Sequence, residues 1–254
     1  MNDFVITIEP NVGAEAHRLS DEIAERDIGA RLIGGMAIRM LAGDRLHPTF
    51  ERTIEDLDFV VAKRERETLS ALLTESGYQA DEHFNALNGA TRMLFLDPTN
   101  DRQVDIFVGG FRMCHELPLT ERLAAMPATL PAAEILMTKL QIVELNEKDR
   151  NDIYSLLLSH DVGAGDEGVI NVERIIELTS DDWGLQKTFE VNFERLATGL
   201  PGVELDDSEK ATIGGRIALL LTSIAEAPKS RRWKLRARIG ERRQWYEVPE
   251  EVDR

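Results

Sequence analysis

Residues 32–39 read LIGGMAIR and residues 55–61 read EDLDFVV, and these two stretches decide the fold that the sequence predicts. A short strand predicted at residues 31–33 leads into Gly34 and Gly35, and a helical pattern resumes at residues 36–41. The glycines therefore lie at a strand-to-helix turn, where backbone N–H groups favour an anion such as a phosphate. Two glycines before a helix are also ordinary turn residues, so the pair alone decides nothing.

The second stretch places two carboxylates on one face of a predicted strand. Residues 57–62 are apolar and β-branched, and the period of two puts Asp56 and Asp58 on the face opposite Leu57. Neighbouring carboxylates repel each other, and a divalent cation relieves this repulsion because Mg²⁺ prefers oxygen ligands. The plainer alternative is a solvated strand end.

A third carboxylate lies within a later apolar strand. Strands predicted at residues 90–96 and 102–108 flank the turn-rich residues 97–101, which indicates a hairpin. Asp105 lies among Val104, Ile106 and other apolar residues of the second strand. A buried carboxylate is costly unless it pairs with a cation, so Asp105 binds either a metal ion or an arginine.

These residues resemble the DNA polymerase β-like nucleotidyltransferase superfamily, in which two glycines, a helix, an Asp-x-Asp strand and a later aspartate form the signature. Within it, residues 32–39 and 52–58 look like the AbiEii/MenT-type branch, whose members are toxins of toxin–antitoxin and phage-abortive systems. The branch resemblance extends to a helix at 133–139, which contains Lys139, and to KDRNDIY at 148–154.

The resemblance implies an α/β (α+β) fold: a nucleotidyltransferase domain with a small mixed sheet flanked by helices at residues 1–119, then a helical domain at 120–254. It implies Mg²⁺-dependent transfer of a nucleoside monophosphate from an NTP to an acceptor hydroxyl at a two-metal site. The implied metal ligands and catalytic residues are Asp56, Asp58 and Asp105, with Lys139 as a catalytic phosphate contact. The implied nucleotide-binding residues are Gly34, Gly35, Arg39, Arg52 and Thr53, of which Arg39 and Arg52 have structural alternatives as partners of the carboxylates.

Three features qualify this interpretation. The gap between Gly35 and Asp56 is longer than in compact members, so the turn and the carboxylates meet only if residues 42–51 loop out. The second turn residue is glycine rather than serine, which leaves phosphate contacts to backbone N–H groups. Asp149 and Asp152 share a helical face and are predicted to anchor Lys139 or Arg150.

Three functions remain open at this point. The first is a toxin-like enzyme that modifies an RNA or tRNA end, with a cognate antitoxin as partner. The second transfers a nucleotide to a small molecule such as an aminoglycoside or lincosamide antibiotic, for which a net charge of −16 supplies acidic groups. The third is a non-catalytic module that binds a nucleotide or a partner, although three converging carboxylates argue against it.

A basic segment interrupts the acidic composition. Residues 229–243 contain eight cations and one acid, Glu241, with Trp233 and Trp245 in or beside them. The segment is either a terminal helix with solvated or paired charges, or a contact for RNA or nucleotide phosphates. The eight cations are Lys229, Arg231, Arg232, Lys234, Arg236, Arg238, Arg242 and Arg243.

The remaining patterns exclude several classes of protein. There is no apolar run long enough to cross a membrane and no signal peptide at the N-terminus, so we expect a cytoplasmic protein. Cys114 is the single cysteine, which excludes an intrachain disulfide. The five histidines show no ligand spacing, which argues against a zinc site, and no P-loop motif is present, which argues against a P-loop NTPase. After a flexible break at 163–168, helices are predicted at 171–178, 185–196, 208–227 and 231–245, followed by an acidic end at 248–254.

Overall fold

The computed structural model describes residues 8–248, which divide into two compact units. The first unit comprises the chain up to residue 41, then 52–112 and 117–130, and the second comprises 42–51, 113–116 and the chain from 131 onward. This division differs from the predicted boundary at residue 120. Residues 128–130 extend the first unit because the backbone N–H of Leu32 donates to Ala128 O at 3.0 Å and that of Leu130 donates to Leu32 O at 3.3 Å.

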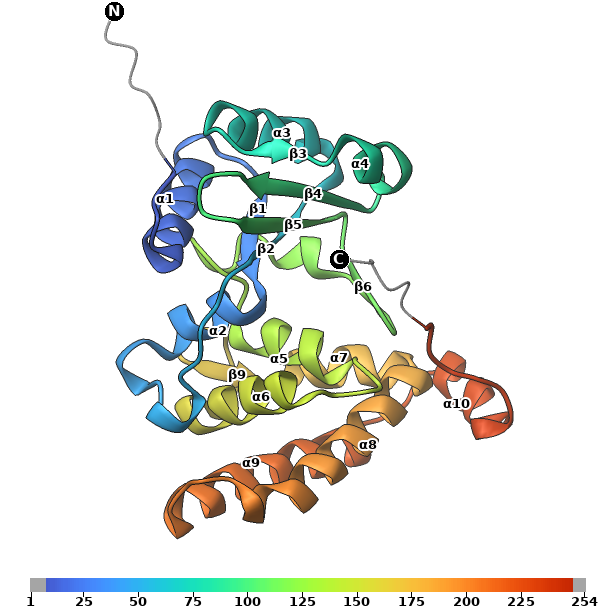
Figure 1. The fold of residues 1–254 in the computed structure, drawn as a ribbon. Helices are drawn as coiled ribbons and strands as arrows, with labels where there is room; N and C mark the ends of the chain where they lie inside the picture. The colour runs from blue at the N-terminus through green and yellow to red at the C-terminus, as the bar shows by residue number, and fades with distance from the viewer. Residues whose placement is uncertain (1–7, 249–254) are drawn as a thin grey trace, which may run out of the picture. The chain divides into compact units, whose positions relative to one another are not determined.

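The first unit is built on a five-stranded mixed sheet of order β1-β2-β5-β4-β3, which confirms the predicted α/β class with a small mixed sheet (Figure 1). β2 and β5 are parallel, and the other neighbours are antiparallel, including the predicted β4–β5 hairpin. Helix α1 contacts β1, whereas α3 and α4 contact the β3–β4 end of the sheet. The strands are β1 (Ala30–Ile33), β2 (Leu57–Val61), β3 (Gln79–Ala80), β4 (Arg92–Asp97) and β5 (Arg102–Val108), and the helices are α1 (Val12–Glu25), α2 (Gly34–Ala42), α3 (Arg66–Glu75) and α4 (Glu82–Asn88).

The two central parallel strands are buried on both faces, as β-branched sequences in such a position predict. Leu57, Val60, Val61, Val104 and Ile106 are all fully buried. Short elements complete this part of the chain: the 3-10 helices η3 (Lys63–Glu65) and η4 (Leu119–Arg122), and a two-stranded ribbon of β6 (Phe111–Arg112) and β7 (Glu116–Leu117).

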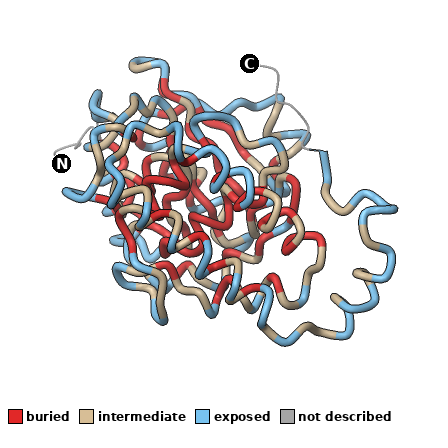
Figure 2. The backbone as a smooth tube through the Cα atoms, turned by 90° about the horizontal axis from the view of Figure 1, so that it is seen from below, coloured by how far each residue is buried: buried red, intermediate tan, exposed pale blue. Residues whose placement is uncertain are grey.

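The second unit is mostly helical, as predicted for the C-terminal part. Helix α9 contacts α6, α7 and α8, and α5 contacts α6, α7 and α8, which buries one face of each helix. Figure 2 shows the result as buried residues alternating with exposed ones along the backbone. The helices are α5 (Ala132–Leu140), α6 (Glu147–Ser159), α7 (Val172–Asp181), α8 (Trp183–Gly199), α9 (Asp207–Glu226) and α10 (Arg231–Ala237), with 3-10 helices η1 (Gly43–Arg45), η2 (Pro48–Phe50), η5 (Leu200–Gly202) and η6 (Gly240–Arg242).

Residues 42–51 contain the 3-10 helices η1 and η2, and Thr49 Oγ1 donates to Glu204 O at 2.8 Å. The structure corrects two local predictions. The break at 163–168 separates two short parallel strands, β8 (Asp161–Gly163) and β9 (Val169–Asn171). The last helix ends at residue 237, before Gly240 adopts a positive φ of 58°, instead of continuing to residue 245. The acidic end at 249–254 lies outside the described residues.

Within residues 8–248, none of the helices combines the length and apolarity that a membrane crossing requires.

Candidate active site in the first unit

The turn between β1 and α2 is closed by side chains from the stretch before and within β2. Gly34 has a φ of +70°, and a Cβ atom there would lie 2.0 Å from Asp58 Oδ2. A Cβ at Gly35 would lie 2.4 Å from Arg52 Nη2. Any side chain at Gly34 therefore collides with the Asp58 carboxylate and strains the backbone. The glycine pair thus allows a carboxylate and a guanidinium to lie directly against the turn.

Asp56 lies directly before β2, Asp58 is the second residue of that strand, and Asp105 lies on the neighbouring strand. Asp58 and Asp105 are register partners across the parallel β2–β5 pair, so their side chains share one face of the sheet. Both Asp56 and Asp58 are half-buried, whereas Leu57 between them is fully buried. The negative charge of Asp56 contributes to a raised pKa of Asp105, after the larger contribution of burial. The structure therefore brings the three predicted aspartates into one neighbourhood.

Arg92 holds Asp105 in an ion pair. The Arg92 Nε–H lies 2.8 Å from Asp105 Oδ1 and 3.1 Å from Oδ2, and Nη2 also donates to Oδ2. Its guanidinium carbon lies 5.9 Å from the ring centroid of Phe84 and 5.1 Å from that of Phe107. Burial raises the pKa of Asp105, and the hydrogen bonds and charge of Arg92 offset part of the rise. The arginine alternative for Asp105 is therefore confirmed in this structure.

The carboxylates of Asp56 and Asp58 are of the chemical kind that Mg²⁺ prefers. Mg²⁺ usually takes one or two carboxylates together with waters and substrate phosphates, and Asp56 and Asp58 supply two half-exposed carboxylates. Among the residues that the structure describes, however, no group of three or more His, Cys, Asp or Glu side chains is placed to hold a metal ion. A third ligand requires Asp105 to share its oxygens between Arg92 and the metal.

The other predicted binding residues have structural contacts in this region. Arg39 Nη2 donates to the backbone oxygen of Arg52 at 3.0 Å, which ties α2 to the segment that precedes the carboxylates. Arg52 Nη1 lies 3.3 Å from the backbone oxygen of Thr53, and the Thr53 side chain is exposed. Arg39 thus supports the turn, and Arg52 lies against Gly35, where a phosphate is expected.

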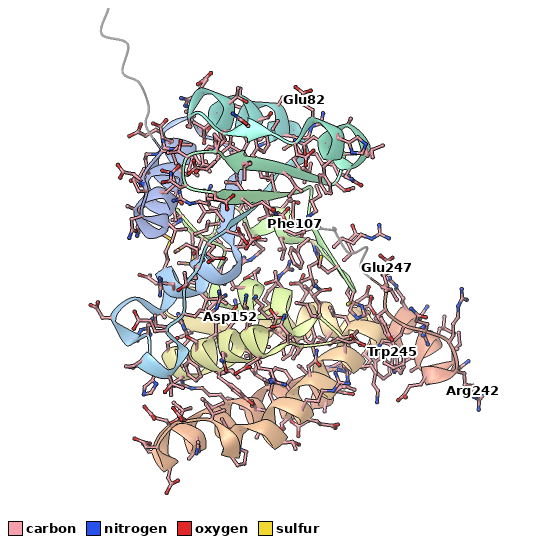
Figure 3. All side chains as sticks on the ribbon, viewed as in Figure 1. Glu82, Phe107, Asp152, Arg242, Trp245 and Glu247 are labelled. Atoms are coloured by element: carbon pink, nitrogen blue, oxygen red, sulfur yellow. The ribbon has the colours of Figure 1, made fainter. Side chains whose placement is uncertain are left out.

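Lys139 belongs to the second unit, on α5, and is held by two carboxylates of α6. Its Nζ lies 2.9 Å from Asp149 Oδ1 and 2.9 Å from Asp152 Oδ2, which confirms the predicted anchoring (Figure 3 labels Asp152). Burial lowers the pKa of Lys139, but the charges and hydrogen bonds of Asp152 and Asp149 raise it by more. The ammonium group of Lys139 is thus charged and paired with both carboxylates. Its contact with a phosphate stays a prediction.

Arg92 is the site residue that the sequence reasoning did not identify. The predicted hairpin carries a signal for it, because the 97–101 turn pairs Leu94 with Asp105 and places Arg92 two residues further along the same face. An arginine on the same face as a buried aspartate is its natural partner.

Comparisons with known proteins give distant likenesses. No model of a known protein family matches the sequence, and neither does any curated protein. An antigenic nucleotidyltransferase-like protein from Paracoccidioides brasiliensis has a crystal structure that matches with a TM-score of 0.44 and 15% identity, over 79% of this chain and 92% of the other. A STING-associated CdnE c-di-GMP synthase from Capnocytophaga granulosa matches with a TM-score of 0.28 and 12% identity, over 86% and 84%. Neither likeness is close enough to assign a substrate or a residue role.

Proposed function

We propose that this chain is a Mg²⁺-dependent nucleotidyltransferase that moves a nucleoside monophosphate from an NTP to an acceptor hydroxyl. The observation that supports the proposal most is the close approach of Asp58 to Gly34, on the strand whose register pairs Asp58 with Asp105. A carboxylate pair beside a glycine turn at a helix start unites ligands for a metal with N–H groups for a phosphate. A solvated strand end does not need its carboxylate packed directly against a glycine turn.

Each side chain of the site has a role in this reaction. Asp56 and Asp58 would hold Mg²⁺, and when bound the metal supplies positive charge to the reacting phosphate oxygens. The backbone N–H groups at the start of α2 and the guanidinium of Arg52 bind and orient the phosphates of the NTP. Arg39 holds the segment before β2 in place.

Asp105 is suited to accept the proton of the attacking hydroxyl. The new bond forms between the acceptor oxygen and the α-phosphorus, the bond to the bridging oxygen breaks, and pyrophosphate leaves. Burial raises the pKa of Asp105, which makes this carboxylate a stronger base than an exposed aspartate, and Arg92 keeps it oriented.

The proposed acceptor is an RNA end, with tRNA as the first candidate, in a toxin-like enzyme controlled by an antitoxin. The resemblance of residues 32–39 and 52–58 to the AbiEii/MenT-type branch and the basic segment at 229–243 support this choice. The rival acceptor is a small hydroxylated molecule, which the acidic overall charge favours. A direct labelling experiment distinguishes the two acceptors.

The experiment incubates the protein with Mg²⁺, each α-labelled NTP and total tRNA, with and without EDTA. We expect label on RNA with the wild-type chain, loss of label with EDTA, and loss of at least about 1,000-fold in an Asp56→Asn, Asp58→Asn variant. An Asp44→Asn, Asp207→Asn variant is the matched control, because it removes two exposed carboxylates elsewhere and should label normally.

Two outcomes would replace the proposal. Label on an aminoglycoside or lincosamide, with none on RNA, would establish the small-molecule transferase instead. NTP binding without pyrophosphate release, with every acceptor tested, would establish the non-catalytic module.

A further inference from the structure

Five of the eight cations in the basic segment are exposed and have no ion pair with any residue in the range 8–248. The other three are engaged: Arg232 Nη1 lies 3.3 Å from Asp181 Oδ2, Arg236 donates to backbone oxygens, and Lys229 Nζ donates to Ile224 O. Contacts within the described chain therefore engage three of the eight cations, and the other five are exposed to solvent. The exposed five are Arg231, Lys234, Arg238, Arg242 and Arg243.

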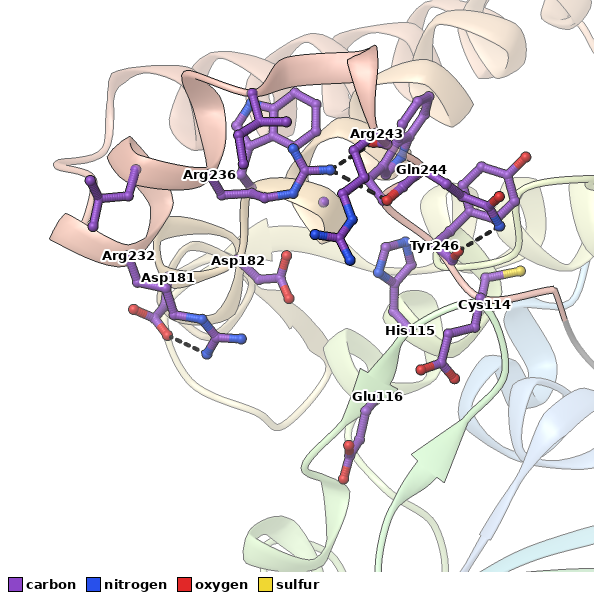
Figure 4. A pocket seen from close by; sticks show the side chains of 16 residues that line it. Cys114, His115, Glu116, Asp181, Asp182, Arg232, Arg236, Arg243, Gln244 and Tyr246 are labelled. Carbon is purple, nitrogen blue, oxygen red and sulfur yellow. Dashed lines mark hydrogen bonds and ion pairs between the residues drawn. The ribbon is translucent and has the colours of Figure 1, made fainter.

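A pocket of about 950 Å³ opens beside these cations in the second unit, and Figure 4 shows its lining. The guanidinium of Arg236 stacks over the ring of Trp183 at 4.7 Å from its centroid. The Trp183 and Trp245 ring centroids are 6.1 Å apart in an edge-on arrangement, and Tyr246 packs edge-on against Trp245 at 5.4 Å. These half-buried planar groups offer the surface on which a nucleobase stacks.

Hydrogen bonds hold the planar groups in place. Arg236 donates to Gly240 O at 2.8 Å and to Arg243 O at 2.9 Å, so its guanidinium plane is fixed. Trp245 Nε1 lies 3.1 Å from Thr188 Oγ1, and the backbone N–H of Glu247 donates to Cys114 O at 2.9 Å. The pocket is thus ordered before any ligand binds, which lowers the entropic cost of binding.

The charges of the pocket determine which part of a ligand enters it. Carboxylates of Glu116, Asp181, Asp182 and Glu247 lie among its lining residues, and they repel a phosphate. The same carboxylates accept hydrogen bonds from base amino groups and ribose 2′-hydroxyls. In the view of Figure 4 the Arg243 side chain extends between Asp182 and His115, from a backbone that continues the exposed basic segment. A base therefore fits inside, and phosphates fit outside against the exposed cations.

We propose that the second unit binds single-stranded RNA, with one base stacked in the Trp183–Arg236–Trp245 pocket and the flanking phosphates on the exposed cations outside it, which are Arg231, Lys234, Arg238 and Arg242. The cations supply affinity, which depends on salt, and the pocket supplies selectivity for unpaired bases. Duplex RNA does not fit, because its bases are stacked within the helix. RNA binding at this surface does not require that the chain transfer a nucleotide. If the proposed function also holds, this surface binds the RNA acceptor.

The test measures binding of a 12-nucleotide labelled RNA by fluorescence anisotropy, without NTP or Mg²⁺. This condition separates it from the transfer assay, since a chain that transfers nothing still gives a binding constant here. We expect tight binding at low salt, and weaker binding of a perfect duplex and of the same sequence as DNA. No binding of single-stranded RNA at low salt would overturn the proposal, equal affinity for the duplex would overturn the base pocket, and equal affinity for the DNA would overturn the assignment to RNA.

Two variants separate the phosphate contacts from the base pocket. Arg238→Gln with Arg242→Gln, two exposed cations that do not line the pocket, should reduce the slope of log K against log salt by about 1.4, the value for two lost phosphate contacts on a single strand. Trp183→Leu should weaken binding by at least about fivefold, the lower limit for loss of one stacked base, and leave the salt slope unchanged.

The matched control is Arg64→Gln with Lys148→Gln, which removes two exposed cations outside the segment and should bind as wild type. Circular dichroism melting verifies that Trp183→Leu is folded. The Arg238 and Arg242 side chains are exposed and lie outside the pocket lining, so the Arg238/Arg242 variant tests the proposal independently. Equal affinities of the wild-type protein, the Arg238/Arg242 variant and the Trp183→Leu variant would overturn the proposal.

Discussion

The charged groups of the two units differ in how the fold uses them. In the first unit, Asp58 lies against a turn that only glycine permits, and Asp105 is buried and held by Arg92. In the second unit, five cations at 231–243 are exposed, and no residue of the described chain forms an ion pair with them. Buried charges must be paired and fixed, which suits a reaction that requires atoms in set positions. Exposed cations adapt to a flexible polyanion, which suits recognition.

A change in the first unit, where the charged groups are held in fixed positions, should have the largest effect on activity. Gly34→Ala would place a Cβ 2.0 Å from Asp58 Oδ2 in a backbone with φ of +70°, so the carboxylate must move. A displacement of about 1 Å in a catalytic group costs roughly 100-fold in rate, so we expect at least this loss of nucleotidyl transfer, measured as kcat/KM.

The control for this change is another glycine. Gly215→Ala in α9 meets no atom within 4 Å, and alanine favours a helix, so transfer should be unchanged and stability should rise by up to about 1 kcal/mol. Full activity in Gly34→Ala would refute the assignment of Asp58 to the site.

The second test asks whether Lys139 belongs with the fixed, paired charges. Its two partners have side chains only 10% and 8% exposed, so Lys139→Met leaves two buried carboxylates without their cation. We expect a loss of about 3–5 kcal/mol in the free energy of unfolding, measured by urea denaturation.

Adding Asp149→Asn and Asp152→Asn to Lys139→Met should recover part of this loss, since the buried charges are then removed. Lys148→Met, an exposed lysine on the same helix as these aspartates, should change stability by no more than about 0.5 kcal/mol. A Lys139→Met protein as stable as wild type, with a raised KM for NTP, would instead assign this lysine to substrate binding.

The smallest expected effect concerns His115, which lies at the pocket beside the basic segment. Burial lowers the pKa of His115, and the charges of Asp182 and Glu247 offset part of this shift. The pKa of His115 is lower in the folded state than in the unfolded state. The contribution of neutral His115 to the free energy of unfolding is therefore complete above the unfolded pKa, and it is lost as the pH falls from the unfolded pKa toward and through the folded pKa. His115→Gln should therefore remove up to about 1 kcal/mol of the stability that wild type loses between pH 7.5 and 5.5.

Thermal melting at several pH values measures this difference. Glutamine can keep the 2.8 Å contact that His115 Nε2 makes with Thr188 Oγ1, so packing changes little. Parallel curves of melting temperature against pH for the two proteins would show that His115 contributes nothing to the pH dependence.

Local patterns in the sequence predicted most of the elements that form the site. Periodicity of two located the strands of Asp58 and Asp105. The spacing of Asp149 and Asp152 predicted that they anchor Lys139 or Arg150, and the structure shows them paired with Lys139. These features depend on residues close in sequence or on regular repeats. The pattern of residues therefore indicates these features without knowledge of the tertiary structure.

Other features depend on long-range contacts that periodicity does not encode. The approach of Asp58 to Gly34 joins residues 24 positions apart. Residues 42–51 and 113–116 belong to the second unit because of tertiary packing, and β8 and β9 pair over only three residues each. The length of α10 was overestimated because Arg and Lys favour helices, whereas Gly240 with positive φ ends the regular structure.

The parallel pairing of β2 with β5 also determines when the candidate active site forms during synthesis of the chain. β5 lies between β2 and β4 in the sheet, although forty residues separate the end of β2 from the beginning of β5 in the chain. A nascent chain that has emerged only through residue 100 contains Asp56 and Asp58 but lacks the strand that aligns Asp105 beside them. Pairing over such a long loop is slow compared with hairpin formation. Catalytic competence should therefore arise late and all at once, with completion of the sheet, and truncated translation products should be inert.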